Sequence, residues 1–261
     1  MEEISISVVM PAYNATQYIE RTILSLQQQT YKSWELVVVD DCSTDETCSL
    51  VSRIAEDDHR IRLVRLEKNF GGPAGPRNVG VREAQYDLVA FLDSDDIWHP
   101  QKLEKQVELV ESSDEFFACS SMIDFEDEST IEFPEIEQVS VDTIGFMAQS
   151  FRAKIPTSSV LVSKLLVSRY PFEESPKYKA VEDFHCWLRI LNSGVTCKKV
   201  REPLLYYRKS EGQISGSKLT MMKKVFMVHK NYPGRGFFTS VLFTASHVLG
   251  GLYFRFLRKG M

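Results

Sequence analysis

The chain has 261 residues, 43% of them hydrophobic, and this composition excludes a protein that is disordered throughout. Its length suits one large α/β domain with or without a small appendage. The net charge of −5 is unevenly distributed, because residues 212–261 contain eight Lys/Arg and no Asp or Glu. The acidic body argues against a nucleic-acid partner, whereas the basic tail favours an anionic membrane surface.

The cysteines and the first residues bear on the cellular compartment. Five cysteines are scattered along the chain without a CxxC pair, so the sequence indicates neither a zinc site nor a disulfide framework. The sequence MEEISISVVM lacks the basic and apolar regions of a signal peptide. We therefore expect a cytosolic protein.

Strand and helix patterns alternate through the first hundred residues. The expected strands cover 4–10, 34–39, 61–66 and 88–92. The expected helices cover 16–28, 43–55 and a short segment that follows the loop at 69–76 and ends at residue 84. The second helix opens with Ser43-Thr-Asp-Glu46, which has the pattern of a capping box. Continuous apolar strands separated by helices predict a mostly parallel sheet with helices on both faces.

Polar and glycine-rich segments follow each of these strands. In order, they are Pro11-Ala-Tyr13, Asp40-Asp41, the loop at 69–76, and Asp93-Ser-Asp95-Asp96. Ligands of such sheets bind beyond the carboxyl ends of the strands. The sequence therefore predicts that these four segments meet at one site.

The second half of the chain has a less regular pattern. Strands are expected at 116–125, 158–162 and 195–200, helices at 100–112 and 180–191, and a solvated acidic segment at 126–137. Residues 236–254 carry no formal charge and lie between Arg235 and Arg255. About 20 residues are needed to span a bilayer, but the His, Ser, Thr and Gly residues here favour a helix lying on the membrane surface. Packing of this helix against the rest of the protein remains an alternative.

The strongest local signal is Asp93-Ser-Asp95-Asp96. Mg²⁺ and Mn²⁺ prefer oxygen ligands and often bind one or two carboxylates together with substrate phosphates. One alternative is an acidic turn that caps the helix starting near Pro100. Another alternative is a haloacid-dehalogenase-like phosphatase, because the segment Asp93-x-Asp95-x-Ile97 resembles the motif of those enzymes. Those enzymes place the motif after the first strand and end it in Thr or Val, whereas here it follows the fourth strand and ends in Ile97.

Three weaker signals have equally simple structural alternatives. Asp40-Asp41 could accept hydrogen bonds from a base or a ribose, or Asp41 or Ser43 could cap the next helix. Arg77, which follows the glycines of the loop, could form charge-assisted bonds with a diphosphate, although such loops are commonly only connections. The acids of the pair Glu182-Asp183 could take part in the chemistry, or they could interact only with the dipole of their helix.

Together these segments resemble the family 2 glycosyltransferases of GT-A fold, over roughly residues 4–210. The matching stretches are SVVMPAYNATQYIERTILSLQQQT, ELVVVDDCSTDET, NFGGPAGPRNVG, LVAFLDSDDIWHPQKLEKQ and VEDFHCWLRI. The resemblance implies an α/β, Rossmann-like sheet in a catalytic domain at 1–211. A basic, partly apolar helical segment at 212–261 would follow it and associate with the membrane surface.

The resemblance also implies residue roles on the donor side. Pro11, Tyr13 and Asp41 would line the pocket for the base and ribose of a nucleotide sugar, with Asp40 beside them. Arg77 would lie near the diphosphate. UDP is the family's most common nucleotide, so the implied donor is a UDP-hexose.

On the reacting side, Asp93 and Asp95 would bind Mn²⁺ or Mg²⁺, with Asp95 as the direct ligand. Asp183 would be the catalytic base and Trp187 would shape the acceptor site. Asp183 would take the proton of the acceptor hydroxyl as its oxygen attacks the anomeric carbon. One base without a dedicated nucleophile predicts inversion of the anomeric configuration.

Two departures from the family pattern bear on how many sugars are transferred and on the ligands of the metal. The processive polymerases carry QxxRW and several membrane spans, whereas the helix here reads His185-Cys-Trp-Leu-Arg189, which favours transfer of a single sugar. Many members have a His soon after Tyr-Tyr-Arg, but residues 206–212 contain none. Phosphate or water would then complete the metal shell.

We therefore expect an inverting glycosyltransferase located peripherally at the cytoplasmic face of the membrane. Its acceptor would be a glycan hydroxyl, on a lipid-linked sugar in surface polysaccharide assembly. A nucleotidyltransferase is an alternative, but it would carry a basic glycine-rich loop where this chain has Pro11-Ala-Tyr-Asn14. A non-catalytic sugar-nucleotide-binding module is a second alternative, which the full set of family carboxylates disfavours.

Overall fold

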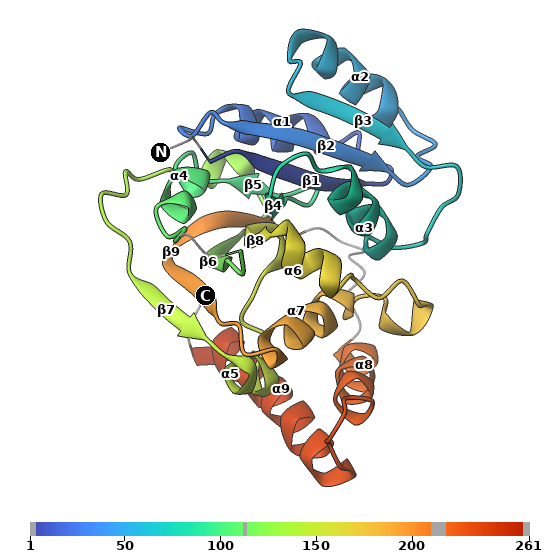
Figure 1. The fold of residues 1–261 in the computed structure, drawn as a ribbon, viewed down its shortest axis with the longest axis vertical. Helices are drawn as coiled ribbons and strands as arrows, with labels where there is room; N and C mark the ends of the chain where they lie inside the picture. The colour runs from blue at the N-terminus through green and yellow to red at the C-terminus, as the bar shows by residue number, and fades with distance from the viewer. Residues whose placement is uncertain (1–3, 112–113, 210–217, 258–261) are drawn as a thin grey trace.

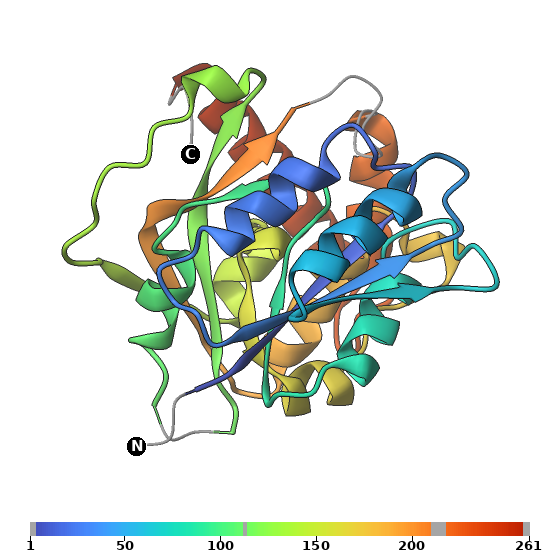
Figure 2. The same cartoon turned by 90° about the horizontal axis from the view of Figure 1, so that it is seen from above.

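The computed structural model describes residues 4–111, 114–209 and 218–257, and its centre is a twisted sheet with helices on both sides (Figures 1 and 2). In this part of the chain the strand order is β3 (Ile61–Arg65), β2 (Trp34–Asp40), β1 (Ile6–Ala12), β4 (Leu88–Phe91), β8 (Leu161–Ser163), β6 (Phe117–Phe125), β9 (Cys197–Arg208) and β5 (Ile97–Trp98). A further strand, β7 (Val141–Ile144), pairs with β9.

Most of these strands run in one direction. The pairs β3–β2, β2–β1, β1–β4 and β6–β9 are parallel, whereas β8, β5 and β7 are antiparallel to their neighbours. Because β6 is antiparallel to β8, which is itself antiparallel to β4, β6 and β9 run in the direction of β1. The prediction of a mostly parallel sheet is confirmed.

Helices cover both faces because the buried strands are apolar on both sides. Helices α1 (Ile19–Gln27), α2 (Thr47–Asp57) and α4 (Lys102–Val107) pack against one face. Helices α3 (Ala74–Glu83), α6 (Lys164–Arg169) and α7 (Glu182–Asn192) cover the other. Neighbouring residues of β1 serve the two cores: Val8 packs with α1 and Val9 with α3.

The sheet and α3 approach each other closely at Gly80. A Cβ atom on Gly80 would lie 2.3 Å from Cγ1 of Val9, so any larger residue would push the helix away from β1. This contact holds α3, and with it Arg77 near its N-terminus, beside the carboxyl end of β1.

Several element boundaries differ from the sequence prediction. Helix α2 begins at Thr47, and the side chain of its N-cap residue, Glu46, forms no capping hydrogen bond. The predicted capping box, and the predicted cap by Asp41 or Ser43, were therefore wrong. Instead, Asp45 accepts hydrogen bonds from the backbone N–H (3.0 Å) and Oγ1 (2.5 Å) of Thr47. Ser43 Oγ accepts one from the backbone N–H of Asn14, which links the loops after β1 and β2.

The second half contains further differences. The strand expected at 158–162 begins as a 3₁₀ turn, η2 (Thr157–Ser159), and only β8 is extended. The strand expected at 195–200 continues to Arg208, past Pro203, because Pro203 lies where the β6–β9 register is irregular. The helix expected at 100–112 ends at Val107 within the described residues.

The C-terminal helices α8 (Lys218–Lys230) and α9 (Phe237–Leu257) pack against α5 (Phe146–Phe151) and α7. The rings of Phe243 and Phe151 lie 5.0 Å apart, and Nε2 of His247 lies 2.9 Å from the carbonyl oxygen of Ser150. The opposite side of α9 is open: Phe238 is 86% exposed and Leu242 57%. Packing on the body and an exposed apolar side therefore coexist in one helix. None of the described helices has the length and hydropathy to cross a bilayer.

Candidate functional site

A cavity of about 850 Å³ opens beyond the carboxyl ends of β1, β2 and β4. It brings together seven of the eight site residues that the sequence analysis predicted: Pro11, Tyr13, Asp41, Arg77, Asp93, Asp95 and Asp183. Asp41, Asp95 and Asp183 come from three distant parts of the chain and line the same space. The four segments predicted to meet at one site do so.

The end of the cavity formed by β1 and β2 has an acidic floor and an aromatic rim. Asp41 is buried, and its Oδ1 accepts a hydrogen bond from the backbone N–H of Phe70 at 2.8 Å. Burial raises the pKa of Asp41 above its usual value. Tyr13 is largely exposed at the rim, where its ring is accessible to a flat ligand.

Asp40 is the predicted site residue that does not line this cavity. It is buried, and its Oδ2 accepts a hydrogen bond from the backbone N–H of Ser43 at 3.0 Å. Its carboxylate therefore shapes the turn after β2, next to Asp41, and does not face the cavity.

Arg77 joins the end of β4 to the start of α7. Its guanidinium forms ion pairs with Oδ1 of Asp93 at 2.6 Å and with Oε1 of Glu182 at 3.3 Å. Its side chain is only 5% exposed. Burial alone would lower the pKa of Arg77, but the charges of Asp93 and Glu182 raise it, so the side chain stays charged. Sequence patterns did not indicate these pairs.

Replacing Arg77 with Met is expected to lower the free energy of unfolding by about 3–5 kcal/mol, because it leaves Glu182 buried without its cation. Burial, and then the charge of Asp183, already raise the pKa of Glu182. A carboxyl whose folded pKa lies above its unfolded value stabilises the fold at low pH, and loses that stability as pH rises through the folded pKa.

The deficit of Arg77→Met relative to wild type should therefore be smaller at about pH 5 than at about pH 7.5. Urea unfolding at the two pH values measures it. Arg82→Met, an exposed arginine on the same helix, is the matched control and should change little. A deficit that grows towards acid pH would contradict the assignment of Glu182.

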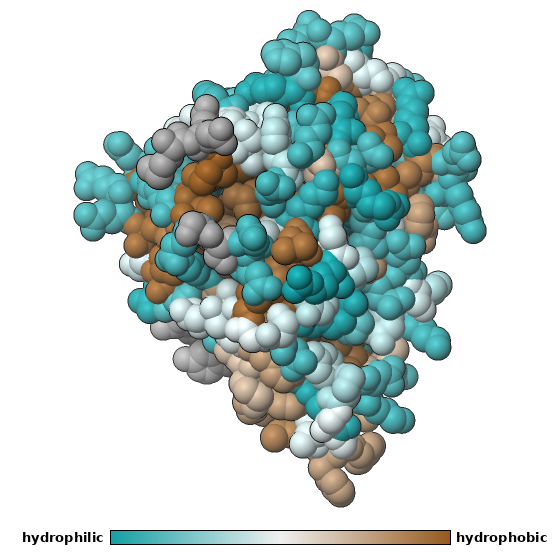
Figure 3. All heavy atoms as spheres, viewed as in Figure 1, coloured by the Kyte–Doolittle hydropathy of each residue, from teal (hydrophilic) through white to brown (hydrophobic). Residues whose placement is uncertain are grey.

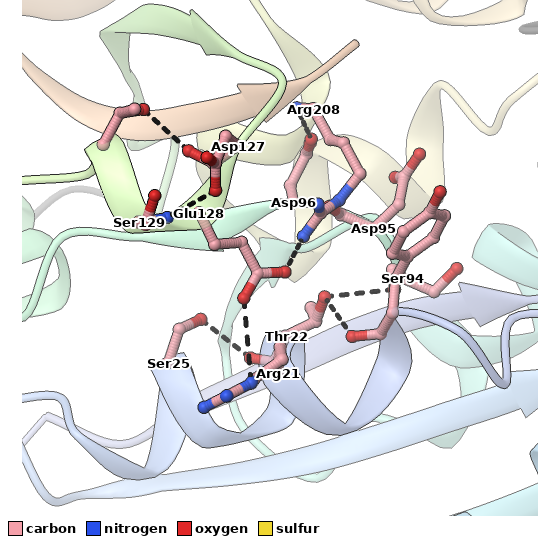
Figure 4. A network of polar contacts seen from close by, with 12 residues as sticks. Arg21, Thr22, Ser25, Ser94, Asp95, Asp96, Asp127, Glu128, Ser129 and Arg208 are labelled. Carbon is pink, nitrogen blue, oxygen red and sulfur yellow. Dashed lines mark hydrogen bonds and ion pairs between the residues drawn. The ribbon is translucent and has the colours of Figure 1, made fainter. Parts of the chain in front are cut away.

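The backbone of the acidic tetrad is fixed from the far side by Arg208 (Figure 4). The backbone N–H of Arg208 donates to Oδ1 of Asp96 at 3.0 Å, and its Nε donates to the carbonyl oxygen of Asp95 at 2.9 Å. Its guanidinium also pairs with Glu128. Asp96 is fully buried and does not line the cavity. Asp96 and Arg208 thus hold the loop that presents Asp95.

The carboxylate of Asp95 fits a divalent cation. Burial, together with the charge of Asp93, raises the pKa of Asp95 to about 6, and a cation would remove this penalty. Within the described residues, no three His, Cys, Asp or Glu side chains gather closely enough to hold a metal by themselves. The residues therefore suit a metal whose remaining ligands are phosphate oxygens and water.

Asp183 lies in the first turn of α7 and accepts hydrogen bonds from two donors. Oγ1 of Thr157 donates to its Oδ2 at 3.0 Å, and the backbone N–H of Phe184 lies 2.6 Å from its Oδ1. Asp183 is half-buried against the cavity, whereas its neighbour Glu182 is buried and paired with Arg77. Of the two acids, Asp183 is the one that forms no ion pair within the part of the chain that the structure describes.

Trp187 is linked to Asp183 through the hydroxyl of Thr157. Its side chain is fully buried and does not line the cavity, so any effect on the acceptor site is through its neighbours. The indole Nε1–H donates to Oγ1 of Thr157 at 3.1 Å, and Thr157 in turn donates to Asp183. Thr157 lies outside every motif of the sequence, and no sequence signal marked it.

Two further lining residues were also missed. Tyr207 lies in the Tyr206-Tyr-Arg208 segment, which could have suggested it, and burial raises its pKa. Lys179 immediately precedes the 180–191 helix prediction and belongs to no motif.

Comparisons with known proteins identify relatives of this chain. TuaG of Bacillus subtilis (strain 168), a candidate teichuronic acid biosynthesis glycosyltransferase, is 34% identical over 230 residues, covering 86% of this chain and 87% of its own. WfaP of Escherichia coli, a UDP-Glc:alpha-D-GlcNAc-diphosphoundecaprenol beta-1,3-glucosyltransferase, is 30% identical over 217 residues. The match covers 82% of this chain and 80% of WfaP.

Solved structures show the same fold. The S. aureus TarS 1–349 complex with UDP-GlcNAc superposes with a TM-score of 0.70 at 22% identity, over 98% of this chain and 74% of that one. The family model for glycosyl transferase family 2 matches residues 7–174. The nucleotidyltransferase and phosphatase alternatives gain no support from these matches. With a family match over more than half of its length and relatives at this level of identity, the chain belongs to glycosyl transferase family 2.

Proposed function

We propose that this glycosyltransferase moves a single sugar from a UDP-hexose to a hydroxyl of a lipid-linked glycan, with inversion and with Mn²⁺ or Mg²⁺, in surface polysaccharide biosynthesis. The observation that carries the proposal is the meeting of Asp41, Asp95 and Asp183 in one cavity. The printed functions of WfaP and WfgD, which use UDP-Glc and a diphosphoundecaprenol-linked sugar, support the donor and acceptor classes. The Pyrobaculum calidifontis mannosyltransferase PcManGT, solved with GDP-Man and Mn²⁺, supports the metal.

In this proposal the nucleoside end of the donor lies between Pro11, Tyr13 and Asp41. The carboxylate of Asp41 accepts hydrogen bonds from the base or ribose, and the ring of Tyr13 packs against the base. Asp40 contributes by holding the turn that carries Asp41.

Asp95, with Asp93 beside it, would hold the cation next to the diphosphate. A cation bound there would neutralise the negative charge that develops on the departing nucleoside diphosphate. Arg77 borders this position and keeps Asp93 oriented through their ion pair.

Asp183 is the proposed base. It takes the proton from the acceptor hydroxyl while that oxygen bonds to the anomeric carbon and the bond to the diphosphate breaks. Thr157 donates to Oδ2 and the backbone of Phe184 to Oδ1, which fixes the carboxylate in one orientation. Attack opposite to the leaving group inverts the anomeric configuration.

The donor class is tested by incubating the protein with Mn²⁺, a diphosphate-linked lipid acceptor and a panel of nucleotide sugars. Release of the nucleoside diphosphate should occur with a UDP-hexose and should require both acceptor and metal. Release that is unchanged by a chelator would contradict metal dependence. No release from any donor, despite nucleotide binding, would favour the non-catalytic module.

We also propose that residues 212–261 attach the enzyme to the cytoplasmic membrane face. Lys223, Lys224 and Lys230 lie on α8, and α9 exposes Phe238 and Leu242. Figure 3 shows apolar atoms over the end of the molecule formed by these helices. Such a mixture suits an anionic bilayer surface.

The double change Phe238→Ser/Leu242→Ser is expected to weaken binding to vesicles that contain an anionic phospholipid by roughly tenfold or more, because two side chains lose their contact with acyl chains. Vesicle co-sedimentation at low and high salt measures it. Leu165→Ser, an exposed leucine on α6, is the control. Equal losses in both variants would contradict a specific role for α9.

A further inference from the structure

The cavity contains more negative than positive side chains. Within the described residues its lining includes five carboxylates and two cations: Asp41, Asp93, Asp95, Glu182, Asp183, Arg77 and Lys179. A diphosphate entering this space meets like charges unless cations offset them. Arg77, the cation that the sequence suggested for this task, already pairs with Asp93 and Glu182.

Lys179 is placed differently from Arg77. Its ammonium has no carboxylate within ion-pair distance in the parts of the chain that are described. Its aliphatic stem lies over the glycine loop, since a Cβ atom on Gly72 would lie 3.7 Å from Cγ of Lys179. Gly71, Gly72 and Lys179 all line the cavity. The side chain therefore spans from the α7 side of the cavity to the donor-side loop.

The backbone around Lys179 is held on both sides. Its N–H donates to the carbonyl oxygen of Pro176 in η3 (Pro176–Tyr178), and its own carbonyl accepts a hydrogen bond from Nζ of Lys224 on α8. The next residue, Ala180, has φ +70°, a conformation that costs a non-glycine residue energy and that the surrounding contacts maintain. A backbone fixed in this way reduces the entropy lost when the lysine binds a ligand.

We propose that the ammonium of Lys179 binds a diphosphate in the cavity. This inference rests on the proposed function and adds a residue to it that no motif indicated. The diphosphate has two possible sources, the nucleotide-sugar donor and a diphosphate-linked lipid acceptor, and one cation can recognise either through charge-assisted hydrogen bonds.

The first test measures the affinity of Lys179→Met for UDP and for uridine in the presence of Mn²⁺. A lost charge-assisted bond should weaken UDP binding by about 10- to 100-fold and leave uridine binding unchanged, because uridine has no phosphate. Lys177→Met, an exposed lysine two residues earlier that does not line the cavity, should match wild type for both ligands. Lys179→Arg should retain most of the affinity.

A second measurement distinguishes the nucleotide-sugar donor from the lipid acceptor as the source of the diphosphate. If the acceptor supplies the diphosphate, Lys179→Met should keep the UDP affinity but raise the KM for a lipid-diphosphate sugar, and leave the KM for the same sugar on a neutral alkyl chain unchanged. The proposal is overturned if Lys179→Met equals Lys177→Met in both UDP affinity and acceptor KM, or if uridine binding falls as much as UDP binding. Wild-type protein that binds no nucleoside diphosphate would instead overturn the proposed function, and this inference with it.

Discussion

Asp183→Asn is expected to lower the rate constant for sugar transfer by about 10²- to 10⁴-fold, the contribution of a positioned general base. The amide has the shape of the carboxylate but cannot accept the proton of the acceptor hydroxyl. The single carbonyl oxygen of Asn can accept only one of the two hydrogen bonds that Asp183 accepts, from Thr157 or from the backbone N–H of Phe184, so the free energy of unfolding should fall by about 1 kcal/mol. UDP affinity should match wild type.

Steady-state release of UDP with saturating donor and acceptor measures this effect. Asp57→Asn, which changes an exposed acid at the end of α2, controls for the loss of one negative charge and should transfer sugar normally. Transfer by Asp183→Asn at close to the wild-type rate would show that another group takes the proton.

Asp95→Asn is expected to lower kcat by about 100-fold or more, because a metal held beside the diphosphate contributes several kcal/mol to the transition state. Its carboxylate lies near that of Asp93 in a partly buried position, a placement that a bound cation stabilises. The variant should also need a higher Mn²⁺ concentration for half-maximal activity. The network of Asp96 and Arg208 does not involve the Asp95 carboxylate, so the loop should remain folded.

Manganese titrations of the activity distinguish a metal defect from a folding defect. Asp87→Asn, at the opposite end of β4 and exposed, is the matched control and should show the wild-type manganese dependence. An Asp95→Asn variant that is slow at every manganese concentration but has an unchanged half-saturation point would contradict direct metal binding by Asp95.

The first half of the fold was predictable because its signals are local. Runs such as residues 36–39 of β2 are apolar without interruption, which is typical of a strand buried on both faces, and polar residues follow directly. The second half mixes antiparallel strands with 3₁₀ turns, whose form depends on distant partners. Ser159, for example, bonds with the β6 residue Ser120 and so leaves the strand pattern that its neighbours suggest.

The site was predictable only as a set of residue types. Motifs at strand ends identified Asp41 and Asp95, because ligand contacts at such ends use the same residue kinds repeatedly. Asp183, which lies on a helix, was identified only through the family resemblance. The pairings between them depend on folding: Arg77 and Glu182 are 105 positions apart in sequence. For the same reason, sequence patterns could not reveal that Trp187 is buried or that Lys179 crosses the glycine loop.

The proposed function requires one cavity to hold a cation and a nucleoside diphosphate between Asp41, Asp95 and Asp183. Crystals grown with Mn²⁺ and UDP, examined by anomalous diffraction, test this requirement directly. We expect an anomalous peak in contact with the Asp95 carboxylate, with the uridine against Tyr13 and Asp41. Manganese and UDP on any other surface, or UDP in the cavity with manganese remote from Asp95, would contradict it.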